Sequence, residues 1–487
     1  MLHVLKEIKF KVNHELLTKS RELGMNKNNL TRRQFLTTAS TGTITALASG
    51  AIPAHGNITK KASKLAILGG QPVRTERWPS WPISDKTEEK SILAALNSGR
   101  WGRSGVEMVS DVEKRFAKLM GSKYCLLVHC GTHALHTSVH VLGIGGGDEV
   151  LVTPYTFVAT IDVILLEDAL PVFVDIDPEA FQMNPDKIEE KITENTKAIM
   201  PVHITGGVCN MDKINAIAKK YNLKVIEDAC QALLAEWRNK KAGTLGDLGC
   251  ISFQSSKPLT CGEGGAILGD DEETMDRCYS FHNFGRRKGK FMTRDRGDYP
   301  ILATKYRVTS FQAAVLNAQM NRVEKQFERR AKNADYLTSR LNEIPGINPR
   351  KDYEGTTRTA YYAYAFRYKK EHFNNLPRKK FLSALRAEGI PCSSGLGTIG
   401  STSTPMNREG LIEDALNSKS FQKIYSRQRL KKYREQNHCP ESDQLCKEVA
   451  GFSQSLLLGT KRDMDDIANA ILKIYENRDI LAKPQTP

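Results

Sequence analysis

The sequence predicts an α/β fold, with a large domain built on a mainly parallel sheet and a smaller C-terminal α/β domain. Between Leu119 and Gly269, short runs rich in β-branched and aromatic residues alternate with stretches whose apolar residues have helical spacing. Strands and helices in this alternation form parallel sheets that are covered on both faces. The chain has 487 residues, of which 40% are hydrophobic and 26% charged, as in globular proteins of two or three domains.

The large domain is predicted over residues 65–332. Its strands are expected within residues 148–157, 171–177, 197–204, 223–229 and 249–255, and a helix over 211–222 follows a suitable N-cap at Asn210. Ligands of such sheets bind at the carboxyl ends of the strands, and the polar clusters of this chain follow predicted strands.

The smaller domain is predicted over residues 333–481. A long helical pattern over 310–341 leads into it from the large domain. An alternating strand is expected at 360–368, a helix with a glycine stop at 378–390, and a closing helix at 463–478.

Residues 1–56 are predicted to be an N-terminal extension that carries an export signal. Paired arginines, Arg32 and Arg33, precede a weakly apolar stretch without charge and a small-residue exit at Ala54. This order resembles a twin-arginine signal, and a disordered basic tail is the alternative. We expect a periplasmic or other extracytoplasmic location, or a cytoplasmic one if the signal is not used, and no stable membrane insertion.

The formal net charge of +16 favours anionic partners, among them phosphorylated small molecules. A nucleic-acid or other polymer-binding protein would combine basic runs with stacking aromatic residues, and the sequence shows no such run. The ten cysteines are scattered without a CxxC pair, so we predict no disulfide framework. His129, His133, His136 and His140 have helical spacing but lack the acid of an HExxH motif, and no metal site is predicted.

Two polar clusters predict an anion site beside a carboxylate. Gly131 and Thr132 lie at a predicted helix start, where exposed backbone N–H groups and the helix dipole suit a phosphate. Asp228 and Gln231 end a predicted strand, where a carboxylate serves as a base, as a metal ligand or as the partner of a protonated ring nitrogen.

A lysine and a hydroxyl complete the predicted site. Ser252 and Lys257 follow the next strand, and lysine is the usual residue for Schiff-base chemistry. Phe157 lies in the loop after another strand. Phosphate donors, an acid, a stacking ring and a lysine are the needs of pyridoxal phosphate, while a phosphate-binding α/β enzyme of another type is the alternative.

The motifs PYTFVAT, PVFVDID, TKAIMPVH, VIEDACQA, SFQSSKPLTCGEGG and YRVTSFQAAVLNAQM occur in the order and spacing of a known family. From about Leu65 to Asn477 the chain resembles the DegT/StrS-type sugar aminotransferases. The resemblance implies the fold type I (aspartate aminotransferase-like) architecture of pyridoxal-phosphate transferases, a homodimer, and pyridoxal 5'-phosphate as cofactor.

The resemblance also implies the role of each site residue. Lys257 would form the Schiff base with the cofactor and move the proton as base and acid, and Asp228 would hold the ring nitrogen protonated. The other cofactor contacts would be Gln231 at the ring oxygen, Phe157 stacked on the ring, and Gly131, Thr132 and Ser252 at the phosphate. From the residues alone, Phe157 could instead be core and Ser252 a strand hydroxyl.

Two positions depart from the family pattern. Lys305 replaces an asparagine that in relatives reaches the phosphate of the neighbouring subunit, and a lysine could contact that phosphate as a point charge. His133 replaces a small residue and is expected to reshape the phosphate cup or the substrate mouth. The basic loop at 285–298 reaches towards substrate or is simply solvated.

The implied function is amino transfer from glutamate or glutamine to a keto-sugar or keto-cyclitol. A pyridoxal-dependent deoxysugar dehydratase is the alternative within the fold, although such relatives tend to carry histidine at the position of Lys257. A non-catalytic exported binding or sensory protein on the same scaffold is the alternative of another class. Loss of Lys257 or Asp228 would favour that reading, and both residues are present.

Overall fold

The computed structural model describes residues 64–103, 107–289, 297–395 and 404–483. The chain divides into two compact units, residues 1–60 and 61–487, and the account below concerns the second. The predicted export signal lies outside the described residues.

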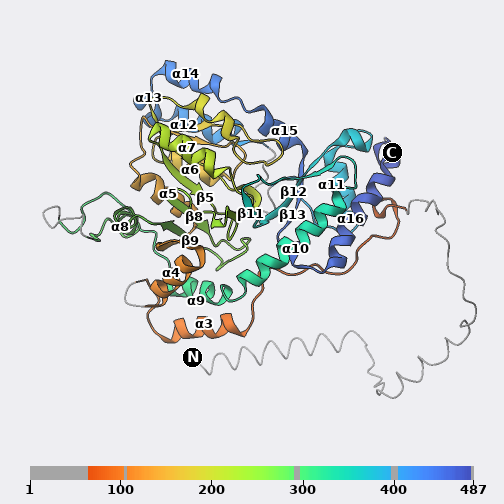
Figure 1. The fold of residues 1–487 in the computed structure, drawn as a ribbon, viewed down its shortest axis with the longest axis horizontal. Helices are drawn as coiled ribbons and strands as arrows, with labels where there is room; N and C mark the ends of the chain where they lie inside the picture. The colour runs from red at the N-terminus through yellow and green to blue at the C-terminus, as the bar shows by residue number, and fades with distance from the viewer. Residues whose placement is uncertain (1–63, 104–106, 290–296, 396–403, 484–487) are drawn as a thin grey trace, which may run out of the picture. The chain divides into compact units, whose positions relative to one another are not determined.

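A seven-stranded sheet with the strand order β1-β9-β8-β5-β4-β2-β3 forms the centre of the fold (Figure 1). The pairs β2–β3, β2–β4, β4–β5 and β5–β8 are parallel, and β9 is antiparallel to both of its neighbours. The prediction of a mainly parallel sheet is therefore confirmed. The strands are β1 Tyr124–Val128, β2 Glu149–Val152, β3 Leu170–Phe173, β4 Thr196–Met200, β5 Lys224–Asp228, β8 Leu248–Ser252 and β9 Gly265–Gly269.

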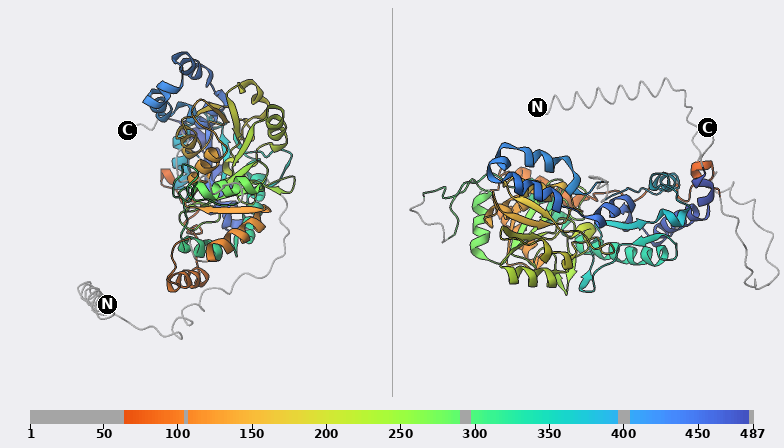
Figure 2. Two further views of the ribbon diagram at one scale, coloured as in Figure 1. Left: turned by 90° about the vertical axis from the view of Figure 1, so that its left-hand side faces the viewer. Right: turned by 90° about the horizontal axis from the view of Figure 1, so that it is seen from above.

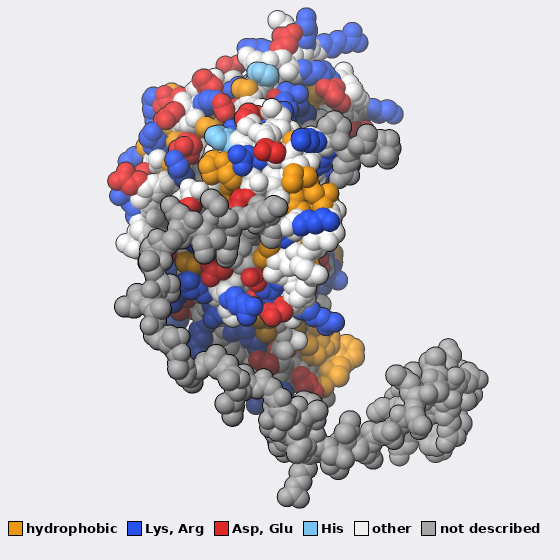
Figure 3. All heavy atoms as spheres, turned by 90° about the vertical axis from the view of Figure 1, so that its right-hand side faces the viewer, with side chains coloured by type: hydrophobic (Ala, Val, Ile, Leu, Met, Phe, Trp, Pro, Cys, Tyr) orange, Lys and Arg blue, Asp and Glu red, His pale blue; other side chains and the backbone are white. Residues whose placement is uncertain are grey.

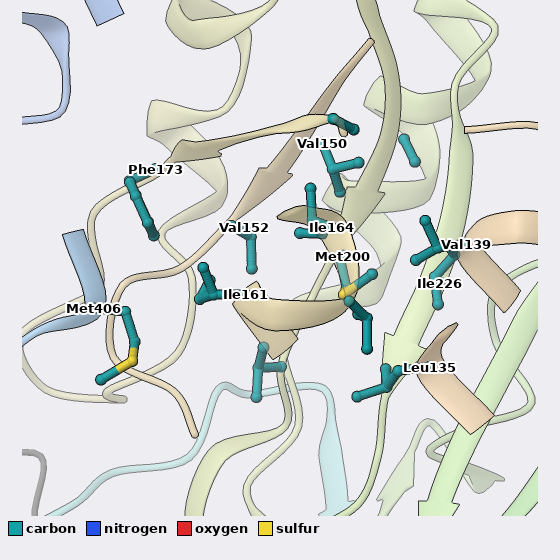
Figure 4. Packing of buried hydrophobic residues seen from close by; sticks show 14 of the residues in the cluster. Leu135, Val139, Val150, Val152, Ile161, Ile164, Phe173, Met200, Ile226 and Met406 are labelled. Carbon is teal, nitrogen blue, oxygen red and sulfur yellow. The ribbon is translucent and has the colours of Figure 1, made fainter. Parts of the chain in front are cut away.

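Both faces of this sheet are buried because its strands carry apolar residues at consecutive positions. In β2, Val150 and Val152 belong to one hydrophobic cluster and Leu151 to another, as the alternation of side chains along a strand requires. Helices α5 Gly131–Val141, α6 Val158–Leu165 and α8 Glu272–Phe281 cover the first face, which Figure 4 shows from close by. Helices α4 Glu107–Met120, α7 Met211–Tyr221 and α9 Ser310–Gln319 cover the second, and α3 Lys86–Asn97 packs on α9.

Helix α7 forms where the sequence predicts it. The side chain of Asn210 accepts a hydrogen bond from the backbone N–H of Lys213 at 3.2 Å, as an N-cap does. The helix ends at Asn222, whose φ of 53° is left-handed.

The pattern over 310–341 forms two helices, α9 and α10 Val323–Leu341, instead of one. The side chain of Arg322 at the junction donates to the carbonyl of Ile83 at 2.8 Å and to the carboxylate of Asp85 at 2.8 Å. Gln319 donates to the same carbonyl at 2.8 Å. The chain before α3 therefore contacts the junction where the helical pattern breaks.

A smaller sheet follows, with the antiparallel order β10-β12-β13. Residues of α10, α11 and α16 belong to its hydrophobic cluster. Figure 2 shows the ribbon of this region from two further sides. The elements of this region are β10 Ile347–Pro349, β12 Ala363–Tyr368, α11 Arg378–Ala387, β13 Val449–Ser453, α16 Lys461–Glu476 and α17 Arg478–Ala482. A third sheet joins β11 Thr356–Arg358 to β6 Glu236–Trp237 and β7 Lys240–Lys241.

Packing crosses the predicted boundary at residue 332 in both directions. Leu65 belongs to the cluster of the smaller sheet. Met406 and the helices α12 Gly410–Asn417, α13 Lys419–Ile424, α14 Arg427–Gln436 and α15 Pro440–Glu448 instead contribute to the cluster of the large sheet (Figure 4). The hydroxyls of Tyr425 and Tyr433 donate to the carbonyls of Asp168 and Pro171, each at 2.8 Å. The predicted boundary separates the large sheet from the smaller one but divides neither hydrophobic cluster cleanly, and the domain division stays a prediction.

The surface in Figure 3 mixes basic and acidic side chains across one face. This mixture gives no support on that face to a polymer-binding role. Among the helices that the structure describes, none combines the length and apolarity needed to cross a membrane.

Candidate active site

A cavity opens where β4, β5 and β8 end. Its walls come from the large sheet, from the starts of α5 and α6, and from the loop before β12. Seven of the eight predicted site residues line it, namely Gly131, Thr132, Phe157, Asp228, Gln231, Ser252 and Lys257. The structure therefore brings together residues that span more than a hundred positions of the sequence.

Asp228 ends β5 and is only 5% exposed. Its Oδ2 accepts a hydrogen bond from the hydroxyl of Thr160 at 2.8 Å, and its Oδ1 accepts one from the backbone N–H of Cys230 at 3.2 Å. The hydroxyl of Thr160 also lies 2.7 Å from that of Thr156. Both carboxyl oxygens of Asp228 are therefore fixed in orientation at the cavity wall.

The neighbouring acid, Glu227, faces the opposite side of the sheet and is fully buried. Its carboxylate accepts backbone hydrogen bonds from Gly243 at 2.8 Å, Leu245 at 2.5 Å and Gly246 at 2.7 Å. A fourth contact joins it to His203 Nε2 at 2.8 Å. Glu227 thus holds the loop before β8 in place and does not line the cavity.

Gln231 is held by the backbone of Thr205. The amide Oε1 of Gln231 accepts the Thr205 N–H at 2.8 Å, and Thr205 has a left-handed φ of 57°. With the oxygen engaged, Nε2 is the group of this side chain left to donate. Gln231 can therefore offer a hydrogen bond to an oxygen in the cavity.

The start of α5 forms an anion cradle. No side chain caps this helix, so the first backbone N–H groups at Gly131 and Thr132 are available to a ligand. A Cβ on Gly131 would lie 2.8 Å from Ser252 Cβ and 3.0 Å from Cys230 Sγ. Only glycine lets β8 come this close, and that closeness brings the Ser252 hydroxyl to the helix start.

Gly265 has a related role on the neighbouring strand. A Cβ at this position in β9 would lie 2.4 Å from the carbonyl oxygen of Cys130 and 2.8 Å from the backbone nitrogen of Gly131. The last glycine of the GEGG motif therefore lets β9 pack against the turn that leads into α5.

Phe157 precedes α6 and is 39% exposed while lining the cavity. The interpretation of this ring as plain core is therefore wrong. Cys230 also lines the cavity, and burial, together with the charge of Asp228, raises the pKa of its thiol well above the ordinary value. A thiol that stays protonated is a poor nucleophile, so Lys257 is the better candidate for covalent chemistry.

Lys257 is half-buried after β8, with its Nζ 4.2 Å from the centre of the Tyr362 ring. The hydroxyl of Tyr362 lies 3.0 Å from the Ser256 hydroxyl, and the ring is 8% exposed. A cation and an aromatic face at this distance attract each other. Tyr362 therefore orients the lysine amine from the region of the smaller sheet.

Lys305 does not line the cavity. It is exposed, and its backbone pairs with that of Asn283. Its expected role at the phosphate of a second subunit stays a prediction. In the basic loop, the backbone N–H of Arg287 donates a hydrogen bond to the carbonyl of Asp298 at 3.1 Å, which joins the two parts of the loop that the structure describes.

His133 turns away from the cavity and stacks on Tyr306, with ring centres 3.7 Å apart. His133 therefore does not reshape the phosphate cup as a residue of the cavity wall. Desolvation, followed by the neighbouring His129 and His136, lowers the pKa of His133 to about 4, so its imidazole is neutral near pH 7.

Further along α5, His136 and His140 share one carboxylate. Glu167 lies 2.9 Å from His136 Nε2 and 3.0 Å from His140 Nδ1, and His136 Nδ1 lies 2.8 Å from the Tyr306 hydroxyl. Desolvation opposes ionisation of Glu167, but these hydrogen bonds outweigh it and lower the pKa of the carboxyl to about 2. His136 and His140 thus serve a structural role, as partners of the Glu167 carboxylate.

Sequence reasoning missed Thr160 and Tyr362. Thr160 lies within the motif PYTFVAT, four positions after Thr156, so a second hydroxyl at helical spacing was the available signal. Tyr362 had no local signal, because its part in the site depends on how the smaller sheet region packs.

The donor set of the cavity fits pyridoxal phosphate. The helix start and Ser252 suit its phosphate, and the carboxylate of Asp228 suits a protonated ring nitrogen. Gly131 matters most for this fit, because a Cβ at this position would collide with Ser252 and Cys230.

The sequence matches the DegT/DnrJ/EryC1/StrS aminotransferase family over residues 82–427. It is 33% identical to the L-glutamine:2-deoxy-scyllo-inosose aminotransferase of Streptoalloteichus tenebrarius, over 85% of this chain and 98% of that protein. The L-glutamine:scyllo-inosose aminotransferase of Streptomyces griseus is also 33% identical, with the same coverage of 85% and 98%.

Solved structures show the same architecture. The crystal structure of 3-amino-5-hydroxybenzoic acid synthase aligns with a TM-score of 0.69 at 27% identity, over 82% of this chain and 99% of that one. The predicted fold of this aminotransferase class is therefore confirmed.

Proposed function

Because the chain belongs to the DegT/DnrJ/EryC1/StrS aminotransferase family, we propose that it moves an amino group from glutamine or glutamate to a keto-cyclitol or keto-sugar, with pyridoxal phosphate held in the cavity. The observation that carries the proposal is the convergence of Lys257, Asp228 and the start of α5 on one cavity. The names of the relatives favour glutamine as donor and a scyllo-inosose type of ketone as acceptor.

Pyridoxal phosphate supplies an aldehyde that accepts amines and a ring that draws electrons from the bond being broken. Asp228 would accept a hydrogen bond from the ring nitrogen and, because Thr160 and Cys230 fix both of its oxygens, would keep that proton in place. Phe157 would stack on the ring, Gln231 would donate to the ring oxygen, and Ser252 would join the helix start at the phosphate.

Lys257 would carry the proton transfer. Its Nζ is the amine that would hold the cofactor, and it would serve as the base and acid that moves a proton from the donor carbon. The contact with Tyr362 would keep this amine at the cavity. A dehydratase is the second candidate on this fold, and the presence of Lys257 argues against it.

The test is the visible spectrum of purified protein supplied with cofactor, before and after borohydride, followed by peptide mass analysis. Wild type should show a band that borohydride bleaches, and the cofactor mass should be retained on the peptide that contains Lys257. Lys257→Ala should show neither. Lys240→Ala, an exposed lysine on β7, is the matched control and should behave as wild type. Absence of the band in wild type would overturn the proposal.

Substrate class is tested by the two half-reactions. Glutamine and glutamate, added separately to the cofactor-loaded enzyme, should convert the visible band, and glutamine should do so with the higher kcat/KM. A keto-cyclitol added afterwards should restore the band faster than a nucleotide-linked keto-sugar. Restoration only by the nucleotide-linked sugar would contradict the cyclitol assignment and leave the aminotransferase assignment intact.

We also propose a homodimer in which Lys305 contacts the cofactor phosphate of the partner subunit. Its exposure, and its position outside the cavity of its own chain, support this role. Sedimentation should give a dimer, and Lys305→Ala should weaken cofactor binding. Mixed dimers of Lys257→Ala and Lys305→Ala should then contain one site that lacks both changes and should regain activity. Mixed dimers as inactive as the parents would contradict this sharing.

Export through residues 1–56 is a further proposal, supported by the order of Arg32, Arg33, the uncharged stretch and Ala54. Replacing both arginines by lysine should retain the protein inside the cell, as cell fractionation would show. An unchanged distribution between wild type and this variant would overturn it.

A further inference from the structure

Within the described part of the chain, one group of histidine, cysteine and acidic side chains has its potential ligand atoms close enough to share a metal ion. The group is His129, Cys130 and His133, and these atoms all lie within 4.8 Å of one another. The sequence argument considered the four histidines as a set, whereas the structure groups two of them with a thiol.

We propose that His129, Cys130 and His133 bind one divalent transition-metal ion of the zinc class, with water in the fourth position. Thiolate and imidazole ligands suit this class of ion, and three protein ligands with one open position is a recurrent zinc geometry. The metal–sulfur bond forms as the Cys130 thiol proton leaves to solvent, which is the usual course of thiol ligation.

The local fold positions two of the ligands firmly. Cys130 is the N-cap residue of α5, with an extended backbone, and His133 follows at i+3, on the same side of the helix. Stacking on Tyr306 at 3.7 Å holds the His133 ring. The Nδ1 of His133 is also shielded from solvent and has no hydrogen-bond partner among the described residues.

The third ligand is free to close the site. His129 is exposed, and its ring centre lies 5.6 Å from that of His133. Zinc–nitrogen bonds of about 2.0–2.1 Å and zinc–sulfur bonds of about 2.3 Å place tetrahedral ligand atoms roughly 3.5 Å apart. The ligand atoms lie within 4.8 Å of one another, so the site has to tighten, and His129 is the exposed side chain of the three. Its backbone N–H is bonded to the Tyr306 carbonyl at 2.9 Å, which fixes the main chain at this ligand.

The neighbouring histidine marks where the site ends. His136 lies one turn further along α5, but its two ring nitrogens contact Glu167 at 2.9 Å and the Tyr306 hydroxyl at 2.8 Å. It therefore has no nitrogen left for a metal, which makes it a matched control on the same helix.

The experiment is a titration of the untagged, metal-free protein with Co²⁺, which reports its coordination through its d–d absorption. Wild type should bind one ion per chain with the intense d–d bands of a tetrahedral site, and Zn²⁺ should displace it. Cys130→Ser and His129→Gln should each weaken binding by about tenfold or more, the scale on which weakened metal sites lose affinity. His136→Gln should bind as wild type does, and so should Cys125→Ser, which changes a thiol of β1 outside the group.

His129→Gln keeps the test decisive, because an exposed side chain can change without loss of the fold. Zn²⁺ should raise the melting temperature of wild type and of His136→Gln but not that of His129→Gln, since an ion bound to the native state stabilises it. Weak octahedral bands in wild type, or equal weakening by the control variants, would overturn the proposal. Because neither readout uses amino transfer, failure of this proposal is separate from failure of the proposed function.

Discussion

The two acids at the end of β5 serve two different regions of the molecule. Asp228 faces the cavity and takes hydrogen bonds from one hydroxyl and one backbone N–H. Glu227 faces the buried loop before β8 and takes three backbone N–H groups. Side chains at neighbouring positions of a strand point to opposite faces. The carboxylate of Asp228 is therefore available to a ligand, whereas that of Glu227 is fully engaged in hydrogen bonds within the fold.

The largest expected effect separates these two roles. Asp228→Asn should lower kcat by about 10²- to 10³-fold, the scale of losing one preorganised electrostatic contact, with little change in unfolding. Glu227→Gln should instead lower the free energy of unfolding by about 3 kcal/mol, because the buried N–H groups lose a charged acceptor. Kinetics and urea unfolding of both variants measure this. Equal losses of activity and stability in the two would contradict the comparison.

The next prediction tests the cavity side of this comparison with Gly131→Ala, a change at the start of α5. The added Cβ would crowd Ser252 and Cys230, and overpacking of this kind costs about 1–3 kcal/mol. We expect the Kd of pyridoxal phosphate to rise by about ten- to a hundredfold, measured by titration of the cofactor-free protein. Gly410→Ala is the control, since its Cβ would meet open space. Unchanged cofactor affinity would show that the helix start does not hold the phosphate.

A smaller effect is expected from the hydroxyl behind Asp228. Thr160→Val removes the donor at 2.8 Å, and hydrogen bonds to charged groups contribute about 1.5–3 kcal/mol. We expect kcat to fall by roughly tenfold, with KM for the donor nearly unchanged. Thr160→Ser should recover the activity, because it restores the hydroxyl. A serine variant as impaired as the valine variant would point to packing instead.

The smallest effect concerns a third acid, Glu167, whose partners are histidine side chains. Its folded-state pKa of about 2 lies below the ordinary value of 4.5. The associated stability is therefore present above about pH 4.5 and is lost as the pH falls towards 2. His136→Gln with His140→Gln should flatten this part of the unfolding profile, as thermal melts across the range would show. If the melting temperature of this variant depended on acid pH as that of wild type does, the hydrogen bonds from the two histidines would not stabilise ionised Glu167.

Much of the fold could be predicted because the buried strands of the large sheet leave long apolar runs. The strands β1 and β9 were not among the predicted runs. In β9, glycine stands at both ends of GAILG, and the close approach of that strand to Cys130 becomes visible only in three dimensions. The break between α9 and α10 was also missed, since both halves keep helical spacing and the contacts at the junction come from the distant Ile83.

The site could be predicted where chemistry and motif coincide, as at Lys257 and Asp228. Residues that act through a contact had no such signal. Tyr362 reaches Lys257 only because two regions pack together, and Thr160 acts through Asp228. The direction in which His133 points was equally invisible, because spacing places it on a helix without saying which neighbour it stacks on.

Tyr362 over Lys257 has a consequence for how the protein is made. The wall of the cavity at Cys130 leaves the ribosome long before the wall at Tyr362 does, because synthesis runs from the first residue to the last. A nascent chain that has reached only the end of the large sheet therefore has a cavity with one side missing. A ligand that needs both walls can therefore bind at full strength only after Tyr362 has left the ribosome.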